Sequence, residues 1–426
     1  MKSLRTKRMI ALIMGVVAAA GLSACSGGQA SGGSSSKNID FWTINLKEGY
    51  TPYITTLMKN YETAHPGVTI NWVDIPDLTQ AQTRLTAALS SGKSPDVVNV
   101  TPFILPQLAK SGAVLPLSKI TGDTAAIGSK YTKGFWDAGV LNGEAYAIPY
   151  YGSASALLYN KAIFQKAGLN PAKPPQTWAE VFADSKIIYA KTGIPGFVQT
   201  LDDFDDAGNP ADIIASQAGV PLLNADGTKS VFNTPTAVSY FQNYVDGVKA
   251  GWISKTSVNG VVLDSAGELA KGKVAMTFLG PWSLRWTKAN SSADVYKNIL
   301  LAPHIKSPTG YSNAFLQQFA IPSGSKNPAQ ALDFARYVSG TVVTLAAQAP
   351  VLPTLTADVT SPKYLSLFGA KVLTAEPIKF FWPQDPNVAQ LIASLRENMQ
   401  AALLGSKSTQ QALDDAVQTW DSLLTK

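Results

Sequence analysis

The sequence predicts an α/β fold with mainly parallel sheets flanked by helices, divided between two lobes. Strand and helix patterns alternate along the chain from Asn38 onward, which indicates repeated β-α-β units. The valine-rich run Asp96–Val100 has the character of a strand that is covered on both faces of a parallel sheet. With 426 residues the chain is longer than one hydrophobic core usually serves, so two lobes are expected.

The first part of the folded chain contains two strand patterns, each followed by a helix pattern. Ile39–Thr43 predicts the first strand, and the alternation of apolar residues over Val68–Trp72 predicts the second. Apolar residues at helical spacing follow each strand: Tyr53, Ile54, Leu57, Met58 and Tyr61 after the first, and Leu78, Ala81, Leu85, Ala88 and Leu89 after the second. Loops at the carboxyl ends of such strands are where ligands usually bind.

Start signals predict several later elements. Thr177 and Glu180 form a capping box for a helix that ends near Gly193. Asn327 with Pro328 opens a helix that runs to Gly340, and Ser408 caps the last helix. Between them, Val274–Phe278 predicts a buried strand that leads into Gly280-Pro281-Trp282.

The N-terminus carries the pattern of a secretory signal peptide over residues 1–24. Basic residues precede an apolar stretch from Met9 to Leu22 that is short for a membrane span. The run Leu22-Ser23-Ala24-Cys25 is similar to the lipobox of bacterial lipoproteins, in which the thiol receives a diacylglyceryl group. We therefore expect Cys25, the only cysteine, to be lipidated, and acylation to anchor the protein to the membrane. A secreted protein with a spare thiol is the alternative.

Residues 25–37 are rich in Gly and Ser, so they predict a flexible tether between the lipid and the folded body. Removal of residues 1–24 takes away four basic side chains and lowers the formal net charge from +6 to about +2. No block of Lys and Arg remains, which argues against nucleic-acid binding.

Several signals of catalysis are incomplete. Gly267–Lys273 matches the beginning of a phosphate-binding loop, but Val274 stands where a magnesium-binding hydroxyl is needed. The two histidines, His65 and His304, have no metal-ligand neighbour at useful spacing. No Gly-x-Ser-x-Gly sequence is present. We expect no cofactor, no metal and no catalytic residue, although a carboxylate pair for glycoside hydrolysis would meet only in the fold.

Acidic and aromatic side chains offer candidate ligand contacts. Asp202, Asp203, Asp205 and Asp206 form the densest acidic cluster, either a solvated loop or one wall of a ligand cleft. The nine tryptophans and fifteen tyrosines supply flat apolar faces of the kind that stack on sugar rings. Trp282 is the strongest candidate, because a Gly-Pro turn projects it from the end of a predicted buried strand.

The order and spacing of these motifs resemble the substrate-binding lipoproteins of carbohydrate ABC importers, a family of extracellular solute-binding proteins that includes maltose-binding protein. The resemblance covers the whole chain after the signal peptide. It rests on these segments: Ile39–Trp42, Gly92–Val98 (GKSPDVV), Ala147–Gly168 (AIPYYGSASALLYNKAIFQKAG), Pro174–Val181 (PPQTWAEV), Gly272–Trp282 (GKVAMTFLGPW), Phe319–Phe334 (FAIPSGSKNPAQALDF) and Val351–Thr354 (VLPT).

This resemblance implies the type II periplasmic-binding-protein fold, in which two α/β lobes joined by three chain crossings close on a ligand. The crossings are expected near Gly152–Ala156, Tyr311–Leu316 and Ala349–Leu355. The first lobe would hold residues 38–151 and 316–350, and the second lobe residues 156–311 and 355–426.

The resemblance also implies a set of ligand-binding residues. Trp282 would be the stacking platform of the second lobe, and the first lobe would contribute Trp42, Asn45, Lys47, Asn99 and Thr101. The residues at the crossings that could touch the ligand are Tyr150, Tyr151, Asn313 and Phe315, with Asp202, Phe204 and Trp382 as looser correspondences. The loop after Val98 lacks the acidic residue that maltose-binding protein offers there, which argues against assuming maltose.

The implied function is binding of an extracellular carbohydrate, expected to be an oligosaccharide, and its delivery to the permease subunits of an ABC importer. The protein would be a monomer anchored by lipid at the extracytoplasmic face of a bacterial cell membrane. Three alternatives stay open: a lipid-anchored glycosidase or other hydrolase, a sensory or adhesive lipoprotein, and a binder of a non-sugar solute such as glycerol phosphate. A phosphate site would need convergent cations, and the candidate loops hold only Lys47 and Arg285.

Overall fold

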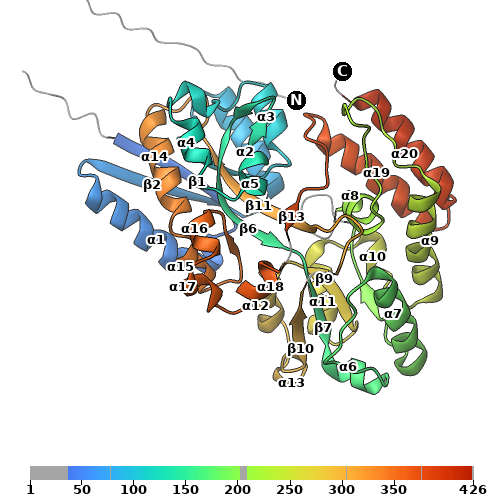
Figure 1. Cartoon of the computed structure of the whole chain (residues 1–426). Coiled ribbons are helices and arrows are strands. Elements are labelled where there is room, and N and C mark those ends of the chain that lie inside the picture. The colour runs from blue at the N-terminus through green and yellow to red at the C-terminus, as the bar shows by residue number, and fades with distance from the viewer. Residues whose placement is uncertain (1–36, 77, 202–208, 304, 376, 425–426) are drawn as a thin grey trace, which may run out of the picture. The chain divides into compact units, whose positions relative to one another are not determined.

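The computed structural model describes residues 37–424 apart from 77, 202–208, 304 and 376. The predicted signal peptide, Cys25 and the tether up to residue 36 therefore lie outside the described residues, as do Asp202, Phe204 and His304. The described chain contains helices and two larger sheets (Figure 1), which confirms the α/β class. None of its helices is both long and apolar enough to cross a membrane.

The first sheet has seven strands in the described chain, in the order β12-β6-β11-β3-β1-β2, with β13 paired to β11. Its strands are β1 (Lys37–Ile44), β2 (Val68–Ile75), β3 (Val97–Val100), β6 (Ala147–Ala154), β11 (Ser312–Ala320), β12 (Leu352–Pro353) and β13 (Ile378–Lys379). The pairs β1–β2 and β1–β3 are parallel, as their β-α-β connections require. Their carboxyl ends therefore meet at one edge of the sheet.

The second sheet has four strands in the order β10-β7-β9-β8. These strands are β7 (Ala156–Asn160), β8 (Phe197–Val198), β9 (Met276–Leu279) and β10 (Ile299–Ala302), and a separate hairpin pairs β4 (Val140–Leu141) with β5 (Glu144–Ala145). A single residue, Ser155, separates β6 of the first sheet from β7 of the second, so the chain passes from one sheet to the other almost without a loop.

Helices surround both sheets (Figure 1). Those before β8 are α1 (Lys47–Ala64), α2 (Leu78–Ser90), α3 (Leu105–Lys110), η1 (Leu117–Lys119), α4 (Thr124–Gly128), α5 (Lys133–Asp137), α6 (Lys161–Lys166) and α7 (Trp178–Thr192). Those between β8 and β11 are α8 (Pro210–Asp212), the π-helix η3 (Ile213–Gln217), α9 (Pro235–Ala250), α10 (Thr256–Asn259), α11 (Val262–Ala270), α12 (Ser283–Ala289) and α13 (Ala293–Tyr296). Those after β11 are α14 (Pro328–Ser339), α15 (Val342–Ala346), α16 (Thr356–Val359), α17 (Pro362–Leu365), α18 (Ala370–Leu373), α19 (Val388–Leu403) and α20 (Thr409–Leu423).

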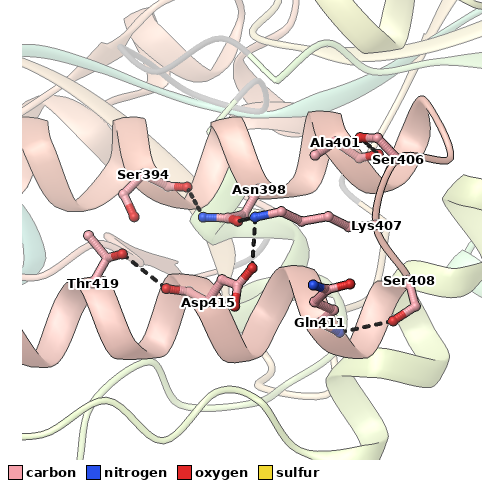
Figure 2. Close-up of polar contacts among 9 residues, drawn as sticks. All are labelled: Ser394, Asn398, Ala401, Ser406, Lys407, Ser408, Gln411, Asp415 and Thr419. Atoms are coloured by element: carbon pink, nitrogen blue, oxygen red, sulfur yellow. Dashed lines mark hydrogen bonds and ion pairs between the residues drawn. The ribbon is translucent and has the colours of Figure 1, made fainter.

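The predicted helix starts are confirmed. Thr177 and Glu180 form both hydrogen bonds of the capping box, and the helix ends at Gly193 in the left-handed conformation. The Ser408 hydroxyl accepts the backbone N–H of Gln411 at 3.1 Å (Figure 2). The ammonium of Lys407, in the turn between α19 and α20, donates to Asn398 and to Asp415, each at 2.7 Å, and thereby joins the two helices (Figure 2).

The sheets are mixed rather than mainly parallel. β11 runs antiparallel to both β3 and β6, and β7 runs antiparallel to both β9 and β10. β6 and β11 both extend to the boundary between the sheets, where the Ser155 N–H donates to the Asn313 carbonyl at 3.2 Å. β6 leaves the first sheet at this boundary and β11 enters the sheet there, so the two strands must run in opposite directions. The spacing of apolar residues, from which the strands are predicted, does not indicate the direction in which neighbouring strands run.

The segment after β12 differs from the expected lobe division. Tyr364, Ala370 and Leu373 belong to the buried cluster that covers the first sheet, and the Tyr364 hydroxyl donates to the Val351 carbonyl at 3.0 Å. These contacts keep residues 356–373 with the first sheet. We therefore propose that the third crossing follows Leu373, instead of lying at Ala349–Leu355, and includes β13.

Candidate functional site

The loop between β1 and α1 is built around the carboxylate of Asp74, at the end of β2. Its oxygens accept the backbone N–H of Leu46 at 3.0 and 3.1 Å and that of Lys47 at 2.8 Å. They also accept the Thr43 hydroxyl, which in turn accepts the indole N–H of Trp72 at 2.7 Å. Sequence reasoning missed Asp74. The only signal for it was a carboxylate at the carboxyl end of a strand parallel to β1.

The side chains of this loop face outward to different degrees. Asn45 is exposed and has a φ of 51°, a left-handed conformation that asparagine tolerates better than most residues. Lys47 is exposed, with its ammonium 6.0 Å from the centre of the Trp72 ring. Trp42, on β1, is half-buried. The loop thus offers an amide, a cation and part of an indole surface at one sheet edge.

Asn99, on the neighbouring strand β3, and Thr101, directly after that strand, are both buried. The Asn99 amide donates to the Gln317 side chain and to the Gln318 carbonyl on β11. A cavity of about 10 Å³ borders Asn99, Trp42 and Thr43, which is room for about one water molecule. In this arrangement Asn99 connects strands, and we expect it to position Trp42 and Thr43 rather than to reach far into a cleft.

Trp282 lies at the carboxyl end of β9 in the second sheet, directly before α12. The Gly280-Pro281 turn is closed by the Ser283 hydroxyl and N–H, which donate to the Gly280 carbonyl at 2.8 and 3.0 Å. Trp282 itself is half-buried. The turn therefore holds part of the indole at the surface, as the Gly-Pro-Trp sequence predicts.

The residues at the crossings are more buried than expected. Tyr150 has 0 % of its surface exposed, and its ring stacks on Phe319 at 4.5 Å in the core of the first sheet. Burial raises the pKa of its phenol well above the usual value, and the neighbouring Tyr53 raises it further. Because strand alternation sends Tyr150 and Tyr151 to opposite faces, only the half-buried Tyr151 stays a surface candidate. Tyr150 is therefore part of the core of the first sheet, and its side chain is not available to a ligand in this arrangement.

Two other candidates at the crossings are also buried. Asn313 is 0 % and Phe315 9 % exposed, and Phe315 lies 6.3 Å from the Tyr151 ring. Trp382 is 8 % exposed and packs edge-on against Phe103, with ring centres 6.5 Å apart. Trp382 follows β13 whereas Phe103 follows β3, so this contact connects the C-terminal segment with the first sheet.

A buried polar network borders the second sheet, and sequence reasoning missed it. The Gln217 amide donates to Gln199 at 3.0 Å and to Asp212 at 2.9 Å. The Tyr244 hydroxyl donates to the Gln217 side chain at 2.7 Å, and burial followed by the Asp212 charge raises the Tyr244 pKa well above its usual value. Gln199 lies directly after β8, and Asp212 is the last residue of α8, so the network connects these two elements. Its members come from separate elements between Gln199 and Tyr244 and follow no helical or strand periodicity, which explains why no motif revealed them.

The described residues contain no group of three or more His, Cys, Asp or Glu side chains that could hold a metal ion. The candidate side chains are instead polar, aromatic and, at Lys47, cationic. Such residues suit non-covalent binding of a small polar molecule.

Two α/β lobes with candidate residues at their strand ends define the class of two-lobed solute-binding proteins. The model of the bacterial extracellular solute-binding protein family matches residues 45–343. The chain therefore belongs to this family, and the family resemblance is confirmed. Membership indicates that the protein works outside the cytoplasm and that its role is to bind a solute.

Relatives and solved structures agree with this assignment. A binding-protein homologue from Brucella abortus (strain 2308) is 26% identical over 387 residues, which cover 88% of this chain and 90% of the relative. The sn-glycerol-3-phosphate-binding periplasmic protein UgpB of the same organism is 32% identical over 157 residues, only 34% of this chain and 35% of its own.

Among solved structures, a periplasmic-binding protein from Synechococcus sp. MITs9220 has a TM-score of 0.78 and 25% identity, and the match covers 90% of this chain and 98% of that one. The GacH receptor of Streptomyces glaucescens GLA.O, solved unliganded and with acarbose, has a TM-score of 0.77 and 22% identity, with 91% and 98% covered. These matches confirm the two-lobed periplasmic-binding-protein fold.

Proposed function

We propose that the protein binds an extracellular carbohydrate, an oligosaccharide, in a cleft between its lobes and delivers it to an ABC importer permease. The observation that carries this proposal is the pair of half-buried tryptophans at corresponding places. Trp42 lies on β1, near the carboxyl end of this strand in the first sheet, and Trp282 follows the carboxyl end of β9 in the second. Indole faces suit the apolar C–H faces of sugar rings, and Asn45, Lys47 and Tyr151 would add hydrogen bonds. Asn99, Thr101, Asn313, Phe315 and Trp382 would support these residues from behind.

The mechanism needs no covalent step. A ligand that contacts both lobes only when they are closed shifts the open–closed equilibrium by its differential affinity for the two states. The permease would then recognise the closed form. The short connection at Ser155 would concentrate the backbone change in a few residues.

Similarity to known proteins supports carbohydrate in particular. The Synechococcus structure is described as that of an oligosaccharide periplasmic-binding protein, and GacH was solved with acarbose. Glycerol phosphate is the second candidate, because the UgpB match covers a third of the chain. It is less favoured, since a phosphate site needs several convergent cations, whereas the candidate loops hold only Lys47 and Arg285, and Arg285 already donates to the Gly49 carbonyl at 2.8 Å.

A thermal-shift screen would test the proposal with a panel of maltooligosaccharides, other oligosaccharides, monosaccharides and glycerol 3-phosphate. We expect at least one oligosaccharide to raise the melting temperature by several degrees at saturating concentration, as binding to the folded state alone requires. Chromatography of the stabilising sugar after long incubation should recover it intact. Stabilisation by glycerol 3-phosphate alone would contradict the carbohydrate assignment, and new sugar products would favour the hydrolase alternative.

A lipid at Cys25 would keep this binding protein beside its permease, on a tether of residues 25–37. The arrangement agrees with a family whose members work outside the cytoplasm. We propose that the mature protein is a monomer, because one chain supplies both lobes.

A further inference from the structure

One contact in the structure connects helices that belong to different sheets without involving any ligand. Arg285 lies on α12, one turn after Trp282, and α12 follows β9 of the second sheet. Its Nη1 donates to the backbone carbonyl of Gly49 at 2.8 Å. The centre of its guanidinium also lies 5.1 Å from the centre of the Tyr50 ring. Gly49 and Tyr50 are in the first turn of α1, which follows β1 of the first sheet.

The receiving turn has a shape that suits this contact. Tyr50 departs from helical geometry, with φ of −132° and ψ of 16°, and its ring packs against the core of the first sheet. A Cβ atom at Gly49 would lie 2.5 Å from Nη1 of Arg285. Gly49 is not among the residues with positive φ, so its backbone does not require glycine. Because Gly49 has no side chain, the Arg285 guanidinium can approach its backbone carbonyl.

We propose that Arg285 is a positioning residue that stabilises the closed arrangement of the lobes whichever ligand is bound. Any opening that separates α1 from α12 breaks both the hydrogen bond and the contact with the Tyr50 ring. An exposed contact between a cation and an aromatic ring, together with one hydrogen bond, is expected to favour the closed state by about three- to tenfold.

This role predicts a particular pattern of affinities. When a ligand binds only the closed state, its apparent affinity is proportional to the closed fraction of the free protein. Loss of Arg285 should therefore weaken all ligands by one common factor. Loss of a residue that touches the ligand, such as Trp282, should weaken different ligands by different factors. Because the contact involves no ligand, it should also raise the closed fraction of the ligand-free protein. The proposal can therefore be tested without knowing the solute.

Distances between spin labels would test the proposal in the full chain with Cys25→Ser. Labels attached to cysteines in place of the exposed Lys59 on α1 and Lys249 on α9 would report the separation of the lobes. Without ligand, we expect short and long distances to be present together. Arg285→Met should lower the ratio of short to long distances about three- to tenfold.

Gly49→Ala provides an independent second variant, because alanine suits the helix while its methyl group displaces the guanidinium. It should have the same effect as Arg285→Met, and the double variant should show no further change, as a shared contact requires. Lys288→Met is the matched control, since Lys288 lies on the same helix but contacts Tyr296, at 5.8 Å, beside its own sheet. The proposal is wrong if the unsubstituted protein shows no short distances, if Arg285→Met leaves the ratio unchanged, or if Lys288→Met changes it equally.

Discussion

The carboxylate of Asp74 accepts the backbone N–H of Lys47 at 2.8 Å and so caps α1 from a neighbouring strand. The N-cap residue of α1 is Leu46, whose side chain cannot accept a hydrogen bond. Asp74 replaces that missing cap by accepting the N–H groups of both Leu46 and Lys47. A negative charge at this helix end also interacts favourably with the helix dipole. The loop proposed to bind ligand is thus held by a residue that need not touch the ligand.

Asp74→Ala should lower the free energy of unfolding by about 1–2 kcal/mol, because N–H groups of the first turn lose their acceptor. It should also weaken sugar binding, since Asn45 and Lys47 are then less restrained. Urea denaturation and calorimetry would measure the two effects. Asp137→Ala is a suitable control, because Asp137 forms an exposed ion pair with Lys133 on a single helix. An Asp74→Ala protein as stable as the parent would contradict the capping role.

Trp282→Ala should weaken binding of the oligosaccharide found by screening by about 10- to 100-fold, as expected for a central aromatic contact. The melting temperature of the ligand-free protein should change little, since Trp282 is only half-buried. Titration calorimetry would measure the affinity. Trp286→Ala is the control, because it removes a second indole from α12, the helix that Trp282 precedes, without removing Trp282. Unchanged affinity in Trp282→Ala would remove this residue from the proposed site.

Alkaline pH should destabilise the protein through its buried tyrosines. Burial raises the pKa of Tyr150 and Tyr244 well above the unfolded value, so both phenols are neutral in the folded state. Their contribution is fully present below about pH 10 and is lost as pH rises from there toward the folded-state pKa values. Urea midpoints between about pH 8 and pH 11 should therefore fall above pH 10.

Tyrosinate absorbance gives a second measurement of the same effect. The buried phenols should ionise only as the protein unfolds, so part of the rise in tyrosinate absorbance should coincide with the loss of structure. Tyr244→Phe should reduce the slope of stability against pH in this range. Midpoints that stay constant up to about pH 11 would contradict the expected role of these tyrosines.

Lys407→Met should lower the free energy of unfolding by about 0.5–1 kcal/mol, because a partly exposed ammonium loses two acceptors that join α19 to α20. Lys297→Met removes a shorter but more exposed ion pair with Asp294, at 2.5 Å, and it should have no measurable effect. Chemical denaturation of both variants would measure the difference. Equal effects of the two substitutions would show that the Lys407 contacts between α19 and α20 add no particular stability.

Cys25→Ser should release the protein from membranes of cells that express the full chain. Two acyl chains on one cysteine give stable anchoring, and the serine hydroxyl cannot form the thioether. Detergent-phase partitioning and intact mass would compare the variant with the parent. A parent protein that carries no lipid mass would overturn the proposed anchor while leaving solute binding unaffected.

Local sequence signals were sufficient to predict a structural feature wherever that feature depends on interactions between neighbouring residues. The capping box of Thr177 and Glu180 and the N-cap of Ser408 are confirmed, because each depends on residues within one helical turn. The Gly-Pro turn and the helix that follows Trp282 are also formed by neighbouring residues, and Trp282 is half-buried. Whether Trp282 binds a sugar stays a prediction.

Other features depend on residues that meet only in the folded chain. Tyr150 and Tyr151 are adjacent and equally aromatic, yet the face of β6 decides that Tyr150 packs into the core. The Gln199, Asp212 and Gln217 network and the Asp74 cap are also invisible in any one segment. The strand directions of the mixed sheets arise from β6 and β11 meeting at the lobe boundary.

The sequence by itself therefore determined the family, the α/β class and the helix starts, since order, periodicity and capping are properties of short segments. Only the tertiary structure decided which candidate side chains reach the surface, because burial depends on distant strands. It also decided that Arg285 contacts Gly49, 236 positions away in the chain, across the two sheets. Such pairing follows from how the sheets are placed, which no local pattern specifies.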